Sequence, residues 1–257
     1  MSASFTCNRC GTFGCDACAF SPLAALLVCR ACAAGGLAEP IPWERRKELG
    51  FIRAFWETTK LLYRAPTAFF RTPLTESGAM GPISYGLVAY TLGQLVWNFV
   101  MLIGLAMTSG VTGIALDEGQ LGGMMAGYFI CVLAIVIPVT LTQAPIQGLI
   151  ALLGGGGLSH LTLRMMKSAN TPFEGTLRAV SYANGPYLLY AVPCVGPFIG
   201  WGFMIVLEVI ALKEAHRIGT DRAAVAVLGY RFLLLGLLVG AYALLAGAAY
   251  LLPTTMR

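Results

Sequence analysis

The chain has 257 residues, of which 57% are hydrophobic and only 11% are charged. A chain of this length with so little polar surface cannot cover a soluble globule, so its composition excludes a soluble globular protein and indicates an integral membrane protein. The net charge is +5, but the basic residues flank apolar stretches and form no continuous patch. This pattern argues against nucleic-acid binding and favours contact with the anionic headgroups of a lipid bilayer.

The basic residues also indicate an orientation. No Lys or Arg occurs between Arg71 and Arg164, and of the 17 basic residues all but Arg257 can be placed on one side of a membrane. Loops rich in Lys and Arg stay in the cytoplasm during insertion, because moving a cation through hydrocarbon is costly. We therefore expect a cytoplasmic N-terminus, and five crossings would then leave the C-terminus outside.

Residues 1–38 form a cysteine-rich head with three Cys-x2-Cys pairs. Thiols stay reduced in the cytoplasm, and Zn²⁺ is bound tetrahedrally by four thiolates, so this spacing predicts a structural zinc module rather than disulfides. Metal binding would supply the folding energy of so short a segment. The six cysteines are Cys7, Cys10, Cys15, Cys18, Cys29 and Cys32.

The choice of zinc ligands has two alternatives. The run from Cys7 to Cys18 resembles RING, B-box and FYVE-type modules, in which alternate cysteine pairs share an ion. That resemblance implies a site of Cys7, Cys10, Cys29 and Cys32, with Cys15 and Cys18 as a second, incomplete pair. A zinc ribbon would instead use the first four cysteines, although its four-residue spacer leaves little room for a hairpin. A redox role for Cys15 and Cys18 lacks the strand–helix context that such a motif needs. A closed zinc site does no chemistry, so we expect the head to recruit a cytoplasmic protein or to cap the membrane body.

Residues 39–76 form an amphipathic segment. Apolar residues recur at near-helical spacing and basic residues occupy the other positions, which predicts a helix lying in the cytoplasmic interface. The alternative is that the segment packs on the protein's own cytoplasmic face. The apolar positions are Leu49, Ile52, Phe55, Leu62 and Phe69.

Residues 77–257 contain five apolar stretches and predict an all-α fold with a five-helix transmembrane bundle. Pro138 and Pro145 should kink the second helix, and the four glycines at 154–157 should break or loosen it. A tight turn joins the third and fourth stretches, which makes them an antiparallel hairpin or one re-entrant hairpin that does not cross. The stretches cover about residues 83–107, 123–153, 175–192, 197–212 and 223–251.

Four polar residues form a candidate intramembrane site. Burying the Glu208 carboxylate inside the fourth span costs free energy unless it is paired or faces water, and Arg231 and Lys213 are its expected partners. The alternative for the polar residues is hydrogen bonding between helices. The sequence carries no catalytic motif, so we expect no enzyme. The four residues are Glu208, Asn184, Asn98 and His160.

Several short runs resemble the Yip family (Ypt/Rab-interacting membrane proteins), in its bacterial branch. They are Phe-Glu-Gly-Thr-Leu-Arg at 173–178, Ser-Tyr-Ala-Asn-Gly-Pro at 181–186, Pro-Cys-Val-Gly-Pro at 193–197 and Leu-Lys-Glu-Ala-His-Arg at 212–217. The resemblance implies five membrane helices, a cytoplasmic N-terminus and, here, the bacterial cytoplasmic (inner) membrane. In eukaryotes the family acts in vesicle traffic through Rab GTPases. Members of the family carry an acidic segment ahead of the first span, and this chain has Gly-Ala-Met-Gly-Pro at 78–82 instead. Rab binding is therefore not carried over to this chain.

Two functions follow from these features. The first is a non-enzymatic membrane organiser, or a trafficking or assembly adaptor, whose zinc head recruits a cytoplasmic partner. The alternative is a small transporter, channel or lipid-moving protein that uses the polar residues of the bundle. Gly-x3-Gly pairs indicate close helix packing and are compatible with a homo-oligomer without specifying one.

Overall fold

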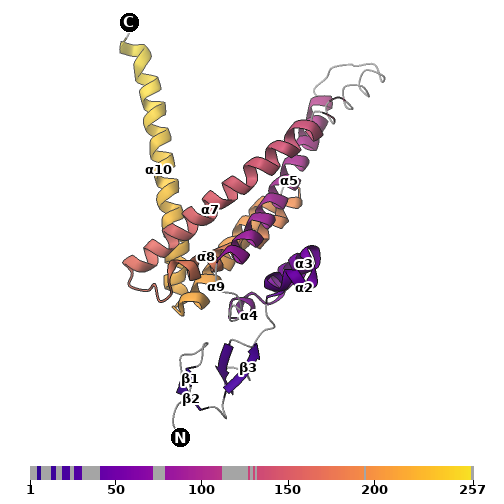
Figure 1. Ribbon diagram of the computed structural model, residues 1–257. Helices are drawn as coiled ribbons and strands as arrows, with labels where there is room; N and C mark the ends of the chain where they lie inside the picture. The colour runs from indigo at the N-terminus through magenta and orange to yellow at the C-terminus, as the bar shows by residue number, and fades with distance from the viewer. Residues whose placement is uncertain are drawn as a thin grey trace.

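The structure is a computed structural model that describes residues 41–71, 79–111, 127, 130, 132–193 and 195–255, together with residues 5–6, 13–15, 19–23 and 26–30 of the cysteine-rich head (Figure 1). From residue 41 onward, every described element is helical, as the sequence predicted. The head has β1 (Phe5–Thr6), β2 (Phe13–Gly14), β3 (Ala19–Leu23) and β4 (Leu26–Cys29), paired as two antiparallel hairpins. The helices are η2 (Pro42–Arg45), α2 (Arg46–Leu49), α3 (Phe51–Arg64), α4 (Pro66–Arg71), α5 (Met80–Val111), η3 (Val132–Val136), α7 (Ile137–Met165), α8 (Phe173–Ala183), η4 (Gly185–Ala191), α9 (Gly196–His216) and α10 (Thr220–Thr255).

Three described helices are long and apolar enough to cross a membrane. These candidate spans are Met80–Gly104 in α5, Ala134–Met165 in α7 and Thr220–Leu245 in α10. They correspond to the first, second and fifth stretches expected from the sequence. Large apolar side chains cover their outer surfaces, which is how a helix faces lipid. The membrane location predicted from composition therefore agrees with the structure.

The third predicted stretch is divided into two short helices. α8 ends at Ala183, and a 3-10 helix, η4, follows from Gly185. Pro186 lies in the first turn of η4, where its missing N–H costs nothing. α9 then returns along η4, as the hairpin prediction requires. The total of five crossings stays a prediction, since α8 and η4 are each too short to span a bilayer.

The expected break at the glycine run of α7 is wrong. The helix continues from Ile137 to Met165 without interruption. A Cβ added at Gly155 would lie 3.1 Å from the hydroxyl of Tyr230, and one at Gly156 would lie 3.7 Å from Leu177. Gly155 therefore lets α10 approach α7 closely, and packing against α10 and α8 holds the helix together.

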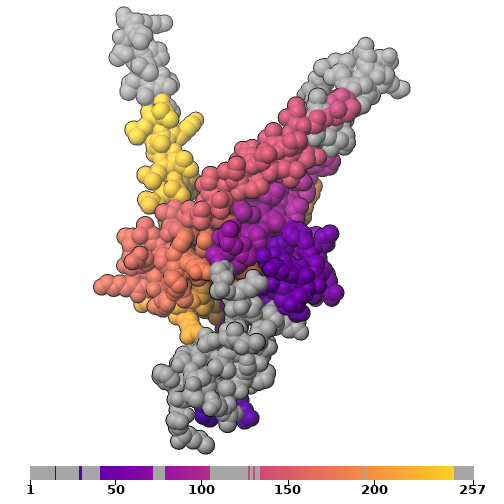
Figure 2. All heavy atoms as spheres, viewed as in Figure 1, coloured from indigo at the N-terminus to yellow at the C-terminus, as the bar shows by residue number. Residues whose placement is uncertain are grey.

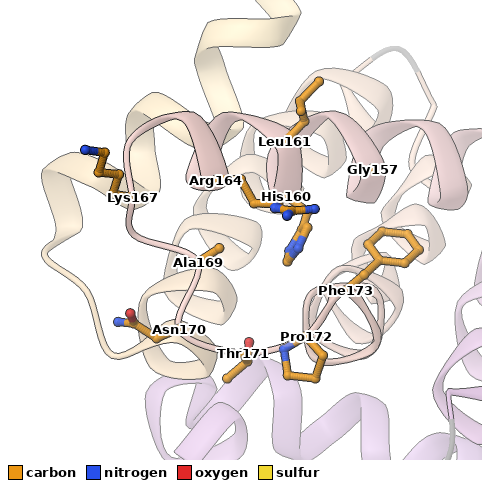
Figure 3. A pocket seen from close by; sticks show the side chains of 10 residues that line it. All are labelled: Gly157, His160, Leu161, Arg164, Lys167, Ala169, Asn170, Thr171, Pro172 and Phe173. Carbon is orange, nitrogen blue, oxygen red and sulfur yellow. The ribbon is translucent and has the colours of Figure 1, made fainter.

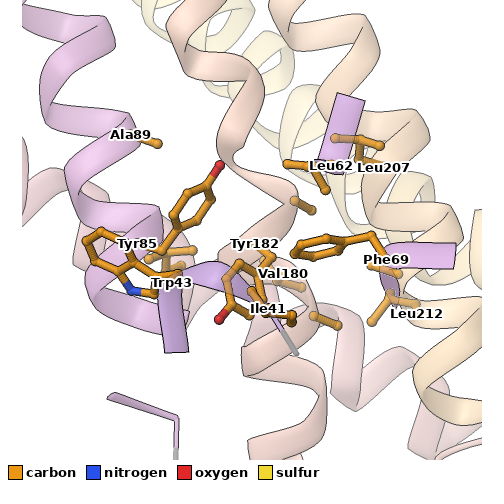
Figure 4. Packing of buried hydrophobic residues seen from close by; sticks show 14 of the residues in the cluster. Ile41, Trp43, Leu62, Phe69, Tyr85, Ala89, Val180, Tyr182, Leu207 and Leu212 are labelled. Carbon is orange, nitrogen blue, oxygen red and sulfur yellow. The ribbon is translucent and has the colours of Figure 1, made fainter. Parts of the chain in front are cut away.

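The core lies at one end of the long helices. Trp43, Tyr85 and Tyr182 are fully or almost fully buried there, and their rings stack edge-on or tilted, with centroids of Tyr85 and Tyr182 5.3 Å apart (Figure 4). The indole N–H of Trp43 donates to the carbonyl of Gly81 at 2.8 Å. Aromatic packing and this hydrogen bond fix residues 41–45 beneath the start of α5.

The amphipathic segment packs one face against this core. Phe55, Leu62 and Phe69 are buried, and the hydroxyl of Tyr63 donates to the carbonyl of Gly185 at 2.9 Å. The inner face of the segment therefore covers the protein itself, as the alternative interpretation required. Its outer face exposes Ile52 (73%), Phe51 (54%) and Trp56 (49%). Membrane contact stays a prediction for this outer face.

α5 and α7 run side by side, whereas α10 packs on α7 and α9 near its start and then diverges (Figure 1). Figure 2 shows the outer half of α10 standing clear of the other described helices. Every residue from Phe232 to Leu245 is exposed. An unpacked, wholly apolar helix of this kind is stable only where lipid or another apolar surface surrounds it.

Candidate functional site

The four polar residues predicted as an intramembrane site have different surroundings. Asn98 donates to the hydroxyl of Thr140 at 2.9 Å, linking α5 to α7. Glu208 forms an ion pair with Arg231 of α10, one of the two partners that the sequence indicated. Asn184 caps α8 and accepts the backbone N–H of Tyr187. Of the four, only His160 lines the larger of the two described pockets.

That pocket has a volume of about 830 Å³ and lies where α7 ends and α8 begins. Ten residues between Gly157 and Phe173 line it (Figure 3). His160, Leu161 and Arg164 come from the last turns of α7, and the loop before α8 supplies the opposite wall. A Cβ added at Gly157 would meet nothing within 4 Å, so the glycine leaves this part of the pocket open.

The end of α7 sets the course of the loop. Lys167 takes a left-handed conformation, with φ 53°. The N–H of Ser168 donates to the carbonyl of Leu163 at 2.8 Å, and together these features form a Schellman-type cap. The chain reverses at this cap, which places Asn170 and Thr171 across from His160.

A hydrogen-bonded chain joins two histidines behind the pocket. The backbone N–H of Thr171 donates to His216 Nδ1 at 3.3 Å, so the ring proton of His216 is on Nε2. Nε2–H donates to the hydroxyl oxygen of Thr176 at 2.8 Å, and that hydroxyl donates to His160 Nδ1 at 2.7 Å. His160 therefore carries its own proton on Nε2. A backbone amide thus sets the tautomer of both rings.

His216 is fully buried, at 0% exposure, beyond the predicted fourth span. Desolvation, with a smaller effect from His160, lowers the pKa of His216 to about 4. The amide of Asn170 also donates to the carbonyl of His216 at 2.7 Å, which ties the loop to the end of α9. His216 is therefore neutral near pH 7 and acts as a structural connector.

Sequence reasoning named His160 as a candidate but missed its connection to His216 through Thr176. The ring centroids of the histidines are 5.9 Å apart. Thr176 is 16 residues from His160 and 40 residues from His216 along the chain. No spacing rule links residues so far apart, so only the packing of α8 against α7 and α9 reveals the connection.

A second buried cluster anchors the amphipathic segment. Arg178 of α8 pairs with Glu44 at 3.3 Å, and the hydroxyl of Tyr182 donates to the same carboxylate oxygen at 3.4 Å. Arg178 and Tyr182 also line the smaller pocket, of about 160 Å³. Because buried charges require partners, this cluster holds residues 41–45 against α8.

Most of the predicted zinc ligands lie outside the described residues: Cys7, Cys10, Cys18 and Cys32. Cys15 and Cys29 are described and half-buried. Within the described part of the chain, no three His, Cys, Asp or Glu side chains are grouped to hold a metal ion. The zinc site therefore stays a prediction from the cysteine spacing.

Comparison with known proteins places residues 60–244 in one family: they match the family model of the Yip1 domain. The matched range runs from α3 to α10 and contains both histidines and the pocket. Neither a curated protein nor a solved structure matches the chain.

Proposed function

Since this chain belongs to the Yip1 domain family, we propose that it is a non-enzymatic membrane organiser or assembly adaptor. Its helices sit in the bilayer, and its cysteine-rich head recruits a cytoplasmic protein. The trafficking role of the family in eukaryotes fits an adaptor better than a catalyst. The bacterial inner membrane is the proposed location.

One observation carries the proposal: the polar residues of the long helices are bonded to one another in separate places. Asn98 bonds to Thr140 on α7, and Glu208 pairs with Arg231 on α10. Polar groups used in this way connect helices and do not line a path for a solute. The extensive buried core lies instead beside residues 41–71, which follow the head directly.

We further propose that the head binds one structural Zn²⁺ through Cys7, Cys10, Cys29 and Cys32. β1 ends one residue before Cys7 and contacts β4, which ends at Cys29. This contact supports ligation by the first and third cysteine pairs. Four thiolates around zinc contribute on the order of 10 kcal/mol, enough to order a small module with little core.

The test compares crosslinked partners of the intact protein with those of Cys7→Ser/Cys29→Ser. The matched control is Cys131→Ser/Cys194→Ser, which removes two cysteines outside the head. We expect about one zinc per chain in the wild type and the control. One specific partner should be captured by both and lost from the head variant. Identical partner lists for all three proteins would remove the recruitment function.

A further variant, Cys15→Ser/Cys18→Ser, separates the two ligand assignments. If the first and third pairs share the ion, this variant keeps its zinc. Loss of zinc from it, with retention in Cys29→Ser/Cys32→Ser, would instead assign the ribbon arrangement. Elemental analysis of the purified proteins distinguishes these results.

The competing function is a transporter, channel or lipid-moving protein. Glu208 is the residue that would serve such a path, because a nearly buried carboxylate inside a helical bundle is a common element of ion pathways, although here it is paired with Arg231. Flux through proteoliposomes should then change in Glu208→Gln. An unchanged flux in that variant, measured beside empty liposomes, would exclude a path through Glu208.

A further inference from the structure

The pocket between α7 and α8 lies at the end of a candidate membrane span. His160, Leu161 and Arg164 occupy the last turns of α7, and the candidate span in that helix ends at Met165. The orientation expected from the distribution of Lys and Arg would put this end of α7 at the phosphate layer of the cytoplasmic leaflet. The pocket uses none of the head cysteines, and what it binds is independent of partner recruitment.

Both charged side chains that line this pocket are cationic. Arg164 and Lys167 are exposed, and the salt bridges among the described residues use neither of them. Glu174, in the first turn of α8, does not line the pocket. Two cations without a salt bridge to any described carboxylate attract an anion.

His160 adds a neutral donor with a fixed proton. Its Nδ1 accepts the hydroxyl of Thr176 at 2.7 Å, so the proton is on Nε2, the ring nitrogen that a ligand can use. The T-shaped contact with Phe173, at 5.6 Å between centroids, and the bond to Thr176 orient the ring. A donor positioned in advance binds an oxyanion with little loss of side-chain entropy.

The pocket also has two large apolar side chains in its lining, beside the polar Asn170 and Thr171. Leu161 is 54% exposed and Phe173 is 40% exposed. A small soluble anion gains no binding free energy from these apolar side chains, whereas the glycerol and first methylenes of a lipid would cover them and remove their surface from water. We propose that this pocket binds the phosphate of an anionic phospholipid, with Arg164, Lys167 and His160 around the phosphate and Leu161 and Phe173 against the lipid chain.

The experiment measures lipid binding by the full-length protein in neutral detergent. Phosphatidylglycerol or phosphatidylcholine is added, and native mass spectrometry gives the bound fraction while thermal unfolding gives the shift in melting temperature. Phosphatidylglycerol should bind and raise the melting temperature more than phosphatidylcholine. Arg164→Gln/Lys167→Gln should weaken phosphatidylglycerol binding by about tenfold or more, since each cation near an anionic surface contributes roughly fivefold in affinity and the variant removes two.

The matched control is Lys60→Gln/Arg64→Gln, which removes the same charge from two exposed residues of α3. It should bind phosphatidylglycerol within about twofold of the wild type, a difference too small to reflect a lost cation contact. Equal weakening in both variants would overturn the proposal, because it would show a general effect of net charge. Equal stabilisation by inorganic phosphate would also overturn it, because the ligand would then be a soluble anion.

A second pair of variants tests the role of the imidazole. His160→Gln keeps an N–H donor, whereas His160→Phe keeps a ring and removes the donor. The phenylalanine variant should bind phosphatidylglycerol more weakly than the glutamine variant while both remain folded. Equal affinity in the two variants would remove His160 from the site.

Discussion

Glu44 and Arg178 are 134 residues apart in the sequence and form an ion pair inside the protein. The exposed fractions of their side chains are 1% and 9%. Removing one partner of a buried pair leaves an uncompensated charge, and this costs more than the pair itself contributes. The pair therefore makes the position of residues 41–45 specific.

We expect Glu44→Gln to lower the free energy of unfolding by about 3 kcal/mol, because Arg178 would stay charged without its carboxylate. Thermal unfolding in detergent measures the change. The control is Glu57→Gln, which breaks the exposed pair with Arg53 and should change stability little. Similar losses in both variants would contradict the special role of the buried pair.

His216 makes stability depend on pH. Its pKa is lowered to about 4 in the folded state, below the unfolded value of about 6.5. Between these two pH values the unfolded chain binds more protons than the folded protein. The stabilisation that neutral, buried His216 gives the fold is therefore complete above pH 6.5 and is lost as pH falls toward 4. The imidazole ring of His216 contacts Thr171, Thr176 and His160.

The melting temperature of the wild type should therefore fall as pH drops from 7 to 4.5, with a total loss on the order of 3 kcal/mol from this group. His216→Gln has nothing to protonate at this position, and its melting temperature should fall less over the same range. Parallel curves for the two proteins would show that His216 does not cause the dependence.

At the scale of elements, α5 and η4 approach each other where α5 has no side chain. A Cβ added at Gly93 would lie 2.3 Å from the backbone carbonyl oxygen of Tyr187, which is closer than atoms can pack. The hairpin of η4 and α9 has a similar contact, because a Cβ at Gly196 would lie 2.2 Å from the carbonyl oxygen of Leu189. Small residues thus set the spacing of these helices.

Gly93→Ala should destabilise the protein by roughly 2 kcal/mol, because the backbones of α5 and η4 would have to move apart. Gly104→Ala is the control in the same helix, since a Cβ there meets nothing within 4 Å. It should be neutral or slightly stabilising, as alanine is the better helix former. Thermal unfolding of the two variants provides the comparison, and equal stability would contradict close packing at Gly93.

At the scale of the whole molecule, the polar segments meet at one end. Arg71, at the end of α4 in the amphipathic segment, pairs with Glu214 of α9 at 3.0 Å, and Asn170, after α7, bonds to His216. These contacts bring three segments that are distant in sequence to the same side. The cytoplasmic orientation of this end stays a prediction from the distribution of Lys and Arg along the chain.

Trypsin tests this orientation without any substitution. Lys167 and Arg217 are exposed at the ends of α7 and α9, so trypsin should cleave after them in inside-out vesicles. Intact spheroplasts should be protected at both residues, because trypsin would reach only the outer face. Cleavage at Lys167 or Arg217 in spheroplasts would contradict a cytoplasmic position for these loops.

How much could be predicted depended on the range of the interaction. The length of the apolar stretches identified α5, α7 and α10 as candidate spans. The free energy of transferring each residue into lipid adds up along a continuous helix, so a long stretch gives a clear signal. The glycine run at 154–157 was misread, because a helix weakened locally can be held by neighbours that the local pattern does not reveal. Likewise, the amphipathic period identified the buried Phe55 and Leu62 but not which surface they cover.

The sequence by itself determined the membrane location, because hydropathy is a sum over neighbouring residues, and its charge pattern predicts the orientation. Only the tertiary structure brought Glu44 to Arg178 and joined His160 to His216 through Thr176. These contacts depend on how α8 packs between segments more than a hundred residues apart. Hydrogen bonds and ion pairs of this kind require distances of a few ångströms, which no periodic pattern along the chain can specify.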